Sequence, residues 1–178
     1  MQIKNTPDRY GFITKLFHWL IALAVIGMLI VGSLLDVLEE PTQGAVYGWH
    51  KSLGMTILAF MILFLLWSAR NIKPRYPQDM PTLQILLATT VRYLLYITVI
   101  AMCLSGWIFS TAKGKPPVVW GWFNLPAPFV PLSNSLGHMV KQWHVYLAWT
   151  ILGLILLHTI GAFYHQFVRK DNVLKRML

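Results

Sequence analysis

The chain has 178 residues, of which 56% are hydrophobic and only 12% charged, and its mean hydropathy is +0.56. A soluble domain of this length carries far more surface charge, so the composition excludes that class and indicates lipid as the solvent. The formal net charge of +9 raises the question of nucleic-acid binding.

Four stretches contain no Lys, Arg, Asp or Glu and are long enough to cross a bilayer. A hydrocarbon core about 30 Å thick needs roughly 20 helical residues, and a helix satisfies all its own backbone groups in lipid. The stretches run from Leu16 to Leu35, Ser52 to Ala69, Tyr93 to Ala112 and Gln142 to Val168. We therefore predict one all-α domain over residues 1–178, an integral membrane four-helix bundle with transmembrane helices at 12–37, 46–70, 83–112 and 138–169.

The first apolar run follows the basic residues Lys4, Arg9 and Lys15, as the core of a signal peptide would. It is longer than the roughly 7–15 residues of such a core, and no clear small-x-small cleavage site follows it. We expect this segment to remain in place as the first helix.

Basic residues are distributed unequally between the two predicted faces of the membrane. With both termini on one side, the other side keeps only Lys51, Lys113, Lys115 and Lys141. The side of the termini carries eleven basic residues: Lys4, Arg9, Lys15, Arg70, Lys73, Arg75, Arg92, Arg169, Lys170, Lys175 and Arg176. Because cytoplasmic segments are enriched in Lys and Arg, we predict that both termini are cytoplasmic. The positive charge is then a topology signal with a contact to anionic lipid, and no nucleic-acid partner is needed.

The longest predicted loop, residues 113–138, lies on the outer side and is rich in proline and aromatic residues. Proline interrupts helical hydrogen bonding, and Trp is favoured at membrane interfaces. We therefore expect a non-helical cap at the outer interface. A loop of this length is often functional.

Six histidines occur, and ionisable groups inside a transmembrane helix are costly and mark function by default. His18 is predicted near the cytoplasmic end of the first helix, and His50 and His144 begin the second and fourth helices at the outer end. His158 follows His144 by fourteen residues. That spacing is about 40° short of four turns and about 21 Å along the axis, so both rings share one face in opposite leaflets.

Matching depths predict two pairs, His144 with His50 near the outside and His158 with His18 near the inside. Two such pairs suit two bis-histidine haem sites stacked across the membrane. A flat macrocycle needs bare backbone beside its ligands, and small residues follow each histidine by about one turn: Ala22, Gly54, Ala148 and Gly161, with Gly32 on the first helix near the outer site. The third helix, with no histidine, is expected to act as scaffold, with Gly106 allowing close packing.

Each histidine has a simpler alternative. A single intramembrane histidine often hydrogen-bonds to a neighbouring helix. Structural zinc would recruit cysteine or carboxylates, and a proton pump would want intramembrane carboxylates; no Asp or Glu lies in these spans. His138 is expected to be a surface residue, and for His165 the alternatives are a haem neighbour, a proton donor to a quinone or an interfacial residue.

Four segments together resemble the bacterial cytochrome b561 family over nearly the whole chain: TKLFHWLIAL, YGWHKSLGM, VKQWHVYLAW and LLHTIGAFYHQFVRKDNVLKRM. The resemblance is most specific in the four histidines and the basic tail. It implies a four-helix bundle in the bacterial inner membrane that binds two non-covalent b haems. By motif, His18 and His158 would ligate the inner haem iron, and His50 and His144 the outer one.

The resemblance also implies electron transfer involving ubiquinone, and some members are similar to superoxide oxidases, which take electrons from superoxide at the outer face. Outer lysines are expected to attract that anion; the alternative is that they are ordinary loop lysines or partners of haem propionates. These lysines are Lys51, Lys113, Lys115 and Lys141, and the candidate quinone or propionate contacts on the inner side are His165, Arg70 and Arg9, with Lys15 and Arg169.

Two other functions stay open at this point. One is a cytochrome b anchor subunit that passes electrons for a dehydrogenase or hydrogenase and co-purifies with that redox partner. The other is a haem-free small transporter or structural membrane protein, which would lack a low-spin b-type absorbance band.

Overall fold

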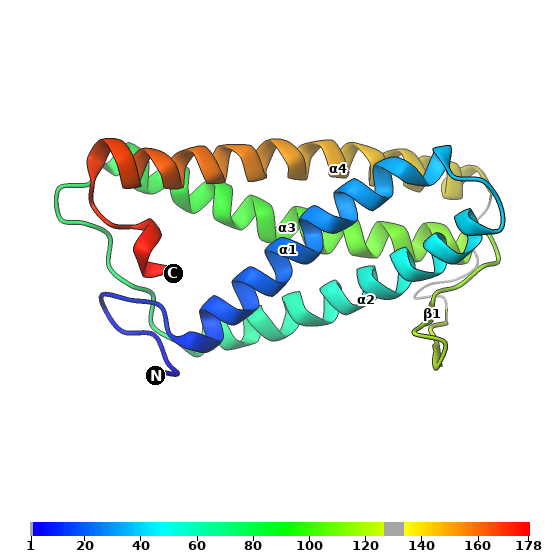
Figure 1. Ribbon diagram of the computed structural model, residues 1–178, viewed down its shortest axis with the longest axis horizontal. Coiled ribbons are helices and arrows are strands. Elements are labelled where there is room, and N and C mark those ends of the chain that lie inside the picture. The colour runs from blue at the N-terminus through cyan, green and yellow to red at the C-terminus, as the bar shows by residue number, and fades with distance from the viewer. Residues whose placement is uncertain (1, 127–133) are drawn as a thin grey trace.

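The computed structural model describes residues 2–126 and 134–178, which form a bundle of four long helices (Figure 1). α1 spans Phe12–Leu34, α2 spans Thr42–Ala69, α3 spans Thr82–Ala112 and α4 spans Asn134–Phe163. All four are long and apolar enough to cross a membrane. The predicted all-α membrane bundle is confirmed.

The two ends of the bundle differ in what they carry (Figure 1). Both termini lie at one end, together with the loop of residues 70–81 between α2 and α3; we call this the terminal end. The opposite end holds the turn at residues 35–41 and the segment 113–126, and we call it the loop end.

The helix bounds depart from the predicted ones mainly at the loop end. α2 begins at Thr42 directly after Pro41, and α4 begins at Asn134, so each starts four residues before its predicted first residue. Proline is well tolerated where a helix starts, because its missing N–H would have no partner there. The opening turns of both helices are too polar for hydropathy to mark them. At its other end, α4 continues from Tyr164 to Arg169 as a π-helical turn, η2.

α3 ends at a glycine that takes up a left-handed backbone conformation. Gly114 has φ of 68°, and the N–H groups of Gly114 and Lys115 donate to the carbonyls of Thr111 and Ser110 at 2.9 and 3.1 Å. These two bonds form a Schellman motif, which satisfies the last carbonyls of the helix and turns the chain away.

Part of the predicted cap folds as a small hairpin on α2. β1, Val118–Val119, pairs antiparallel with β2, Phe123–Asn124. Trp120 between them donates its backbone N–H to Ser52 Oγ and its indole N–H to Thr56 Oγ1, each at 3.1 Å. The hairpin is therefore anchored to α2 at the residues two and six positions after His50. Residues 127–133 of this loop lie outside the described residues.

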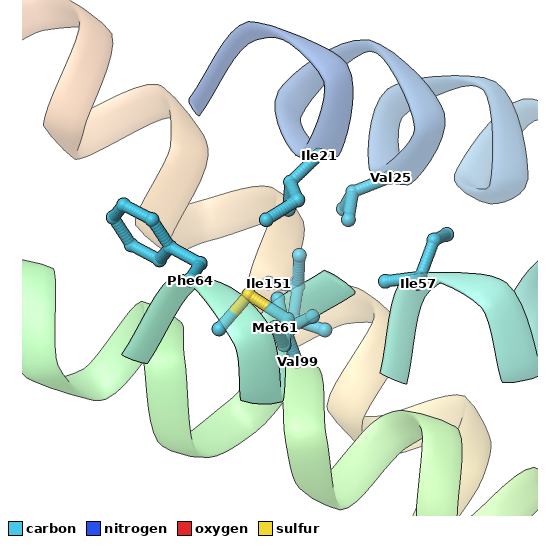
Figure 2. Close-up of a cluster of buried hydrophobic side chains, with 7 residues drawn as sticks. All are labelled: Ile21, Val25, Ile57, Met61, Phe64, Val99 and Ile151. Atoms are coloured by element: carbon cyan, nitrogen blue, oxygen red, sulfur yellow. The ribbon is translucent and has the colours of Figure 1, made fainter. Parts of the chain in front are cut away.

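A core of large apolar side chains fills the centre of the bundle (Figure 2). α1 packs on α2, α2 on α3 and α3 on α4, whereas α4 makes few close backbone approaches to α1 or α2. The core side chains come from all four helices: Ile21, Val25, Ile57, Met61, Phe64, Val99 and Ile151. Ile151 is only 1% exposed and is the residue midway between His144 and His158.

Large apolar side chains also cover the outer faces of the helices. Leu23, Ile97 and Ile160 are each more than 60% exposed. In water this surface would favour aggregation, but against lipid tails it carries no such cost. The exposed faces therefore fit a chain that spans a membrane.

Candidate functional site

The structure brings together the same two histidine pairs that the matching depths predict. At the loop end, the rings of His50 on α2 and His144 on α4 have centroids 6.3 Å apart. At the terminal end, the rings of His18 on α1 and His158 on α4 have the same centroid separation, 6.3 Å. One pair therefore lies on each side of the apolar core.

This separation suits one metal ion between each pair of rings. An imidazole nitrogen binds a metal at about 2.0 Å and lies about 1.1 Å from its ring centre, so two rings on opposite sides of one ion have centroids about 6 Å apart. Within residues 2–126 and 134–178 no cluster of three His, Cys, Asp or Glu side chains could hold an ion. A two-histidine site therefore fits haem iron, whose other four ligands come from the macrocycle, better than structural zinc.

Hydrogen bonding across helices, the simpler role of an intramembrane histidine, does not account for His18 or His50. The Nδ1 atoms of both rings are buried and have no hydrogen-bond partner in the described part of the chain. His158 remains exposed although its ring faces His18. The side chain of His158 is thus accessible to a bound group.

His144 differs from the other three because its Nδ1 has a partner on α3. The buried Ser105 hydroxyl lies 2.9 Å from Nδ1 of His144 and 2.8 Å from the carbonyl oxygen of Met102. Since the carbonyl can only accept, Ser105 donates its proton to Met102 and accepts the Nδ1–H of His144. The hydrogen therefore sits on Nδ1, and Nε2 is left with the lone pair that binds a metal.

Two glycines provide bare backbone against the rings of the loop-end pair. A Cβ at Gly106 would lie 3.0 Å from Cε1 of His144, and a Cβ at Gly32 would lie 3.4 Å from Cε1 of His50. Gly32 thus lies beside the site where its spacing placed it. The nearest neighbour of a Cβ at Gly54 is instead Met28, at 3.6 Å, and one at Gly161 meets nothing within 4 Å.

The candidate lysines all lie at the loop end, but their side chains differ in exposure and hydrogen bonding. Lys51 is partly buried, and its Nζ donates to the backbone carbonyl of Lys115 at 3.0 Å. Lys113, Lys115 and Lys141 have exposed side chains. His138 is also exposed and belongs to neither histidine pair.

At the terminal end, His165 is part of a charged network that closes the end of α4. Its Nδ1 lies 2.6 Å from Asp171 Oδ2, and Arg169 bridges that carboxylate to Asp79 at 3.2 and 2.8 Å. Burial raises the pKa of Asp171, but hydrogen bonds from His165, the Val173 N–H and Arg169 outweigh it and hold that pKa below its ordinary value. Asp171 is therefore ionised at neutral pH, and its stabilising contribution is lost only as the pH falls through the lowered pKa.

The other candidates at this end are not brought to His165. Arg9 and Arg70 have exposed side chains, and Lys15 is partly buried on the first turn of α1. No described hydrogen bond or ion pair joins any of the three to His165.

Comparison with known proteins agrees with this geometry. The family model described as prokaryotic cytochrome b561 matches residues 9–178. The chain belongs to this family. It is 34% identical to Cytochrome b561 homolog 2 of Escherichia coli K12, over 100% of this chain and 95% of that protein. It is 30% identical to Cytochrome b561 homolog 1 of the same organism, over 72% of each chain, and 28% identical to Probable superoxide oxidase CybB of Yersinia pestis, over 96% of each.

Membership of the cytochrome b561 family makes the chain a multi-pass bacterial membrane protein of redox function. The family implies haem b and electron transport. The paired histidines, the metal-compatible separation and the bare backbone at Gly106 and Gly32 all fit that group.

Ser105 is a site residue that was not predicted from the sequence, in which α3 has only a scaffold role. A Ser–Gly pair at positions 105 and 106, inside an otherwise apolar helix, was the available signal. Such a pair places one polar group and one bare backbone position side by side on a helix. Which histidine they meet depends on how α3 is rotated against α4, and local sequence does not specify that rotation.

With haem bound between His50 and His144, we predict that Ser105→Ala raises the midpoint potential of that haem. When the Ser105 hydroxyl accepts the Nδ1–H of His144, the imidazole becomes a stronger electron donor to ferric iron. Removing the hydroxyl therefore favours the ferrous form. We expect the ferrous-to-ferric ratio at the wild-type midpoint to rise about threefold to tenfold, where tenfold is about 59 mV for a one-electron couple. A redox titration followed in the visible spectrum measures this. Ser105→Thr, which keeps the hydroxyl, should stay close to wild type, and an equal shift in both variants would contradict the assignment.

Proposed function

We propose that this chain is a di-haem b cytochrome in which His18 and His158 hold one haem and His50 and His144 hold the other. The observation that carries this proposal is the pair of 6.3 Å ring separations at opposite ends of the bundle. Haem held by these histidines would supply a one-electron carrier, and with imidazole nitrogens as the protein's ligands it would transfer electrons without binding the substrate at its iron.

The chain's own contribution is to hold the two sites apart in a dry, low-dielectric interior. His144 and His158 lie on one helix, about 21 Å apart along its axis. Figure 2 shows the apolar core, and its α4 member, Ile151, is the residue midway between His144 and His158. Close apolar packing of this kind leaves little space for water. The proposed electron path runs along this core, from the loop end to the terminal end.

The proposed electron donor is superoxide at the loop end. Lys113, Lys115 and Lys141 are exposed at that end, and Lys51 lies beside His50. Exposed Asp36, Glu39 and Glu40 in the turn at residues 35–41 offset part of this charge, so the proposed attraction of a small anion is local to the lysines. The relative named Probable superoxide oxidase CybB supports this choice of substrate. The unequal distribution of basic residues supports cytoplasmic termini, and thus a loop end on the outer side of the inner membrane.

The proposed electron acceptor is ubiquinone. Two superoxide anions each give up one electron and leave as dioxygen, and one ubiquinone takes up the two electrons and two protons to form ubiquinol. His165 is the candidate proton donor, because its Nδ1 is held by the ionised Asp171. Arg9 and Arg70 are further candidates for contacts with the quinone or a propionate.

The decisive experiment mixes the purified, haem-loaded protein with a superoxide source and a soluble ubiquinone analogue. We expect quinol to form at a rate that superoxide dismutase abolishes. We also expect the triple variant Lys113→Gln, Lys115→Gln, Lys141→Gln to lower the rate about tenfold at low ionic strength and less at high salt, because screening weakens steering.

A matched control removes three exposed positive charges at the terminal end, with Lys4→Gln, Lys170→Gln and Lys175→Gln. This variant should keep the wild-type rate. Absence of quinol formation by fully haem-loaded protein would contradict the superoxide proposal and favour an anchor subunit, whose redox partner would then co-purify. Absence of any low-spin b-type band would contradict the di-haem proposal itself.

A further inference from the structure

Arg92 is a cation placed well inside a membrane-spanning helix. It is the eleventh residue of α3, so it lies about 15 Å along the axis from Thr82, where the helix starts at the terminal end. Its side chain is only partly exposed. Because Arg92 directly precedes the charge-free stretch Tyr93–Ala112, its guanidinium lies at the cytoplasmic boundary of that stretch, where a partly buried charge is costly unless a partner compensates it.

The chain itself supplies no such partner. All six acidic residues lie in the described parts of the chain, and the ion pairs formed there involve Arg169 and His165 but not Arg92. What Arg92 contacts is phenolic: its Nη2 donates to the hydroxyl of Tyr76, which also pairs with Thr89 Oγ1 at 2.8 Å. The hydroxyls of Tyr10 and Tyr96 lie within electrostatic reach. Neutral phenols orient the guanidinium without neutralising it.

Arg92 lies level with His158, a member of the terminal-end pair: it is thirteen residues before Ser105, which contacts His144, and His158 is fourteen residues after His144 on the antiparallel α4. The charge of Arg92 is also felt at His158. Its guanidinium has five N–H donors in a planar fork, and a carboxylate matches two of them at once. A ubiquinone head group is neutral and gives no counter-ion. A lipid phosphate is the other anion of this chemistry, and the carbon-labelling experiment below distinguishes it from a haem carboxylate.

We propose that Arg92 binds a propionate carboxylate of the haem held by His18 and His158, with Tyr76 fixing the other side of its guanidinium. This inference rests on the proposed di-haem function and adds an anion-binding residue to one of its two sites. Arg92 then acts on the haem through charge: a cation beside the macrocycle favours the ferrous form, which carries one more electron.

The test compares Arg92→Gln and Arg92→Lys in a His50→Ala background, where only the terminal-end haem is expected to remain. For Arg92→Gln, we expect the ferrous-to-ferric ratio at the parent midpoint to fall about tenfold, which is about 59 mV for one electron. Arg92→Lys keeps the charge but not the fork, so its fall should be smaller. Arg75→Gln removes an exposed positive charge at the same end and should leave the ratio unchanged.

A second measurement serves if Arg92→Gln does not accumulate. Redox-difference infrared spectroscopy of the two-haem protein with haem labelled at its propionate carbons should show carboxylate bands that shift between the wild type and Arg92→Lys. Haem-loaded Arg92→Gln protein with the same ratio as Arg75→Gln, or labelled bands that do not move in Arg92→Lys, would overturn the inference and leave the di-haem proposal intact. A wild-type protein without haem would instead overturn the proposed function.

Discussion

Purified His50→Ala and His144→Ala proteins are expected to carry one haem per chain, about half of the wild-type haem content, because a bis-histidine site loses the macrocycle when one axial ligand is removed. His18→Ala and His158→Ala should lose the other haem. Each of the two groups should keep a low-spin b-type band, with a different midpoint potential in each group. Pyridine haemochrome analysis gives the content, and a redox titration identifies the haem that remains.

Double variants test the pairing rather than the mere importance of each histidine. The double variant His50→Ala, His144→Ala should keep one haem, as either single variant does, because both residues serve one site. The double variant His50→Ala, His158→Ala should lose both haems. His138→Ala, at an exposed histidine outside both pairs, is the matched control and should keep the full content. Complete loss in the His50 plus His144 variant would contradict two independent sites, and retention of all haem in any of the four single variants would remove that residue from the ligand set.

Gly106→Val is expected to displace the His144 ring and to release the loop-end haem. A Cβ at this position would already lie 3.0 Å from Cε1 of His144, and valine adds two methyl groups on a stiff side chain. Overpacking of this kind costs about 1–3 kcal/mol, and here the strain falls on a proposed ligand. We expect the haem content to fall by about half. The free energy of unfolding should fall by about 1–3 kcal/mol, which thermal unfolding measures.

Gly27→Val is the matched control, because a Cβ at Gly27 of α1 meets nothing within 4 Å. It carries the same change of side chain inside another spanning helix and should keep both haems. A Gly106→Val protein with full haem content and an unshifted loop-end potential would show that the approach of α3 to His144 is not required. Loss of haem in both glycine variants would point to general destabilisation instead.

Much of the fold could be predicted because lipid imposes a simple rule on sequence. Charge-free runs of sufficient length must be helices. Lys51 precedes the second run and Lys113 follows the third, so two antiparallel helices place both lysines on the same face of the membrane. The errors lie where that rule stops. The first turns of α2 and α4 are polar, so both helices begin earlier than hydropathy predicts. The predicted end of the fourth helix at residue 169 agrees with the structure, although its last turn, Tyr164–Arg169, is π-helical.

The two histidine pairs could also be anticipated, because helical geometry converts residue number directly into depth. His144 and His158 share a helix face by their spacing alone, and the ends of α1 and α2 bring His18 and His50 to the same two depths. Ser105 and Arg92 could not be assigned in this way. Both lie on α3, where neither spacing nor hydropathy tells which neighbouring helix a side chain meets.

The sequence alone determines that this chain is a membrane protein, how many times it crosses the bilayer, and at which depths its histidines lie. Each of these follows from the length of the hydrophobic runs and the rise of a helix. Only the tertiary structure decides which atoms meet: Ser105 against His144, the bare backbone of Gly106 beneath that ring, and Arg92 among tyrosines near His158. Those contacts depend on the rotation and crossing of helices, which packing between distant segments sets. The depth of a residue in the membrane follows from its position along its own helix. The direction in which its side chain points depends on how all four helices pack.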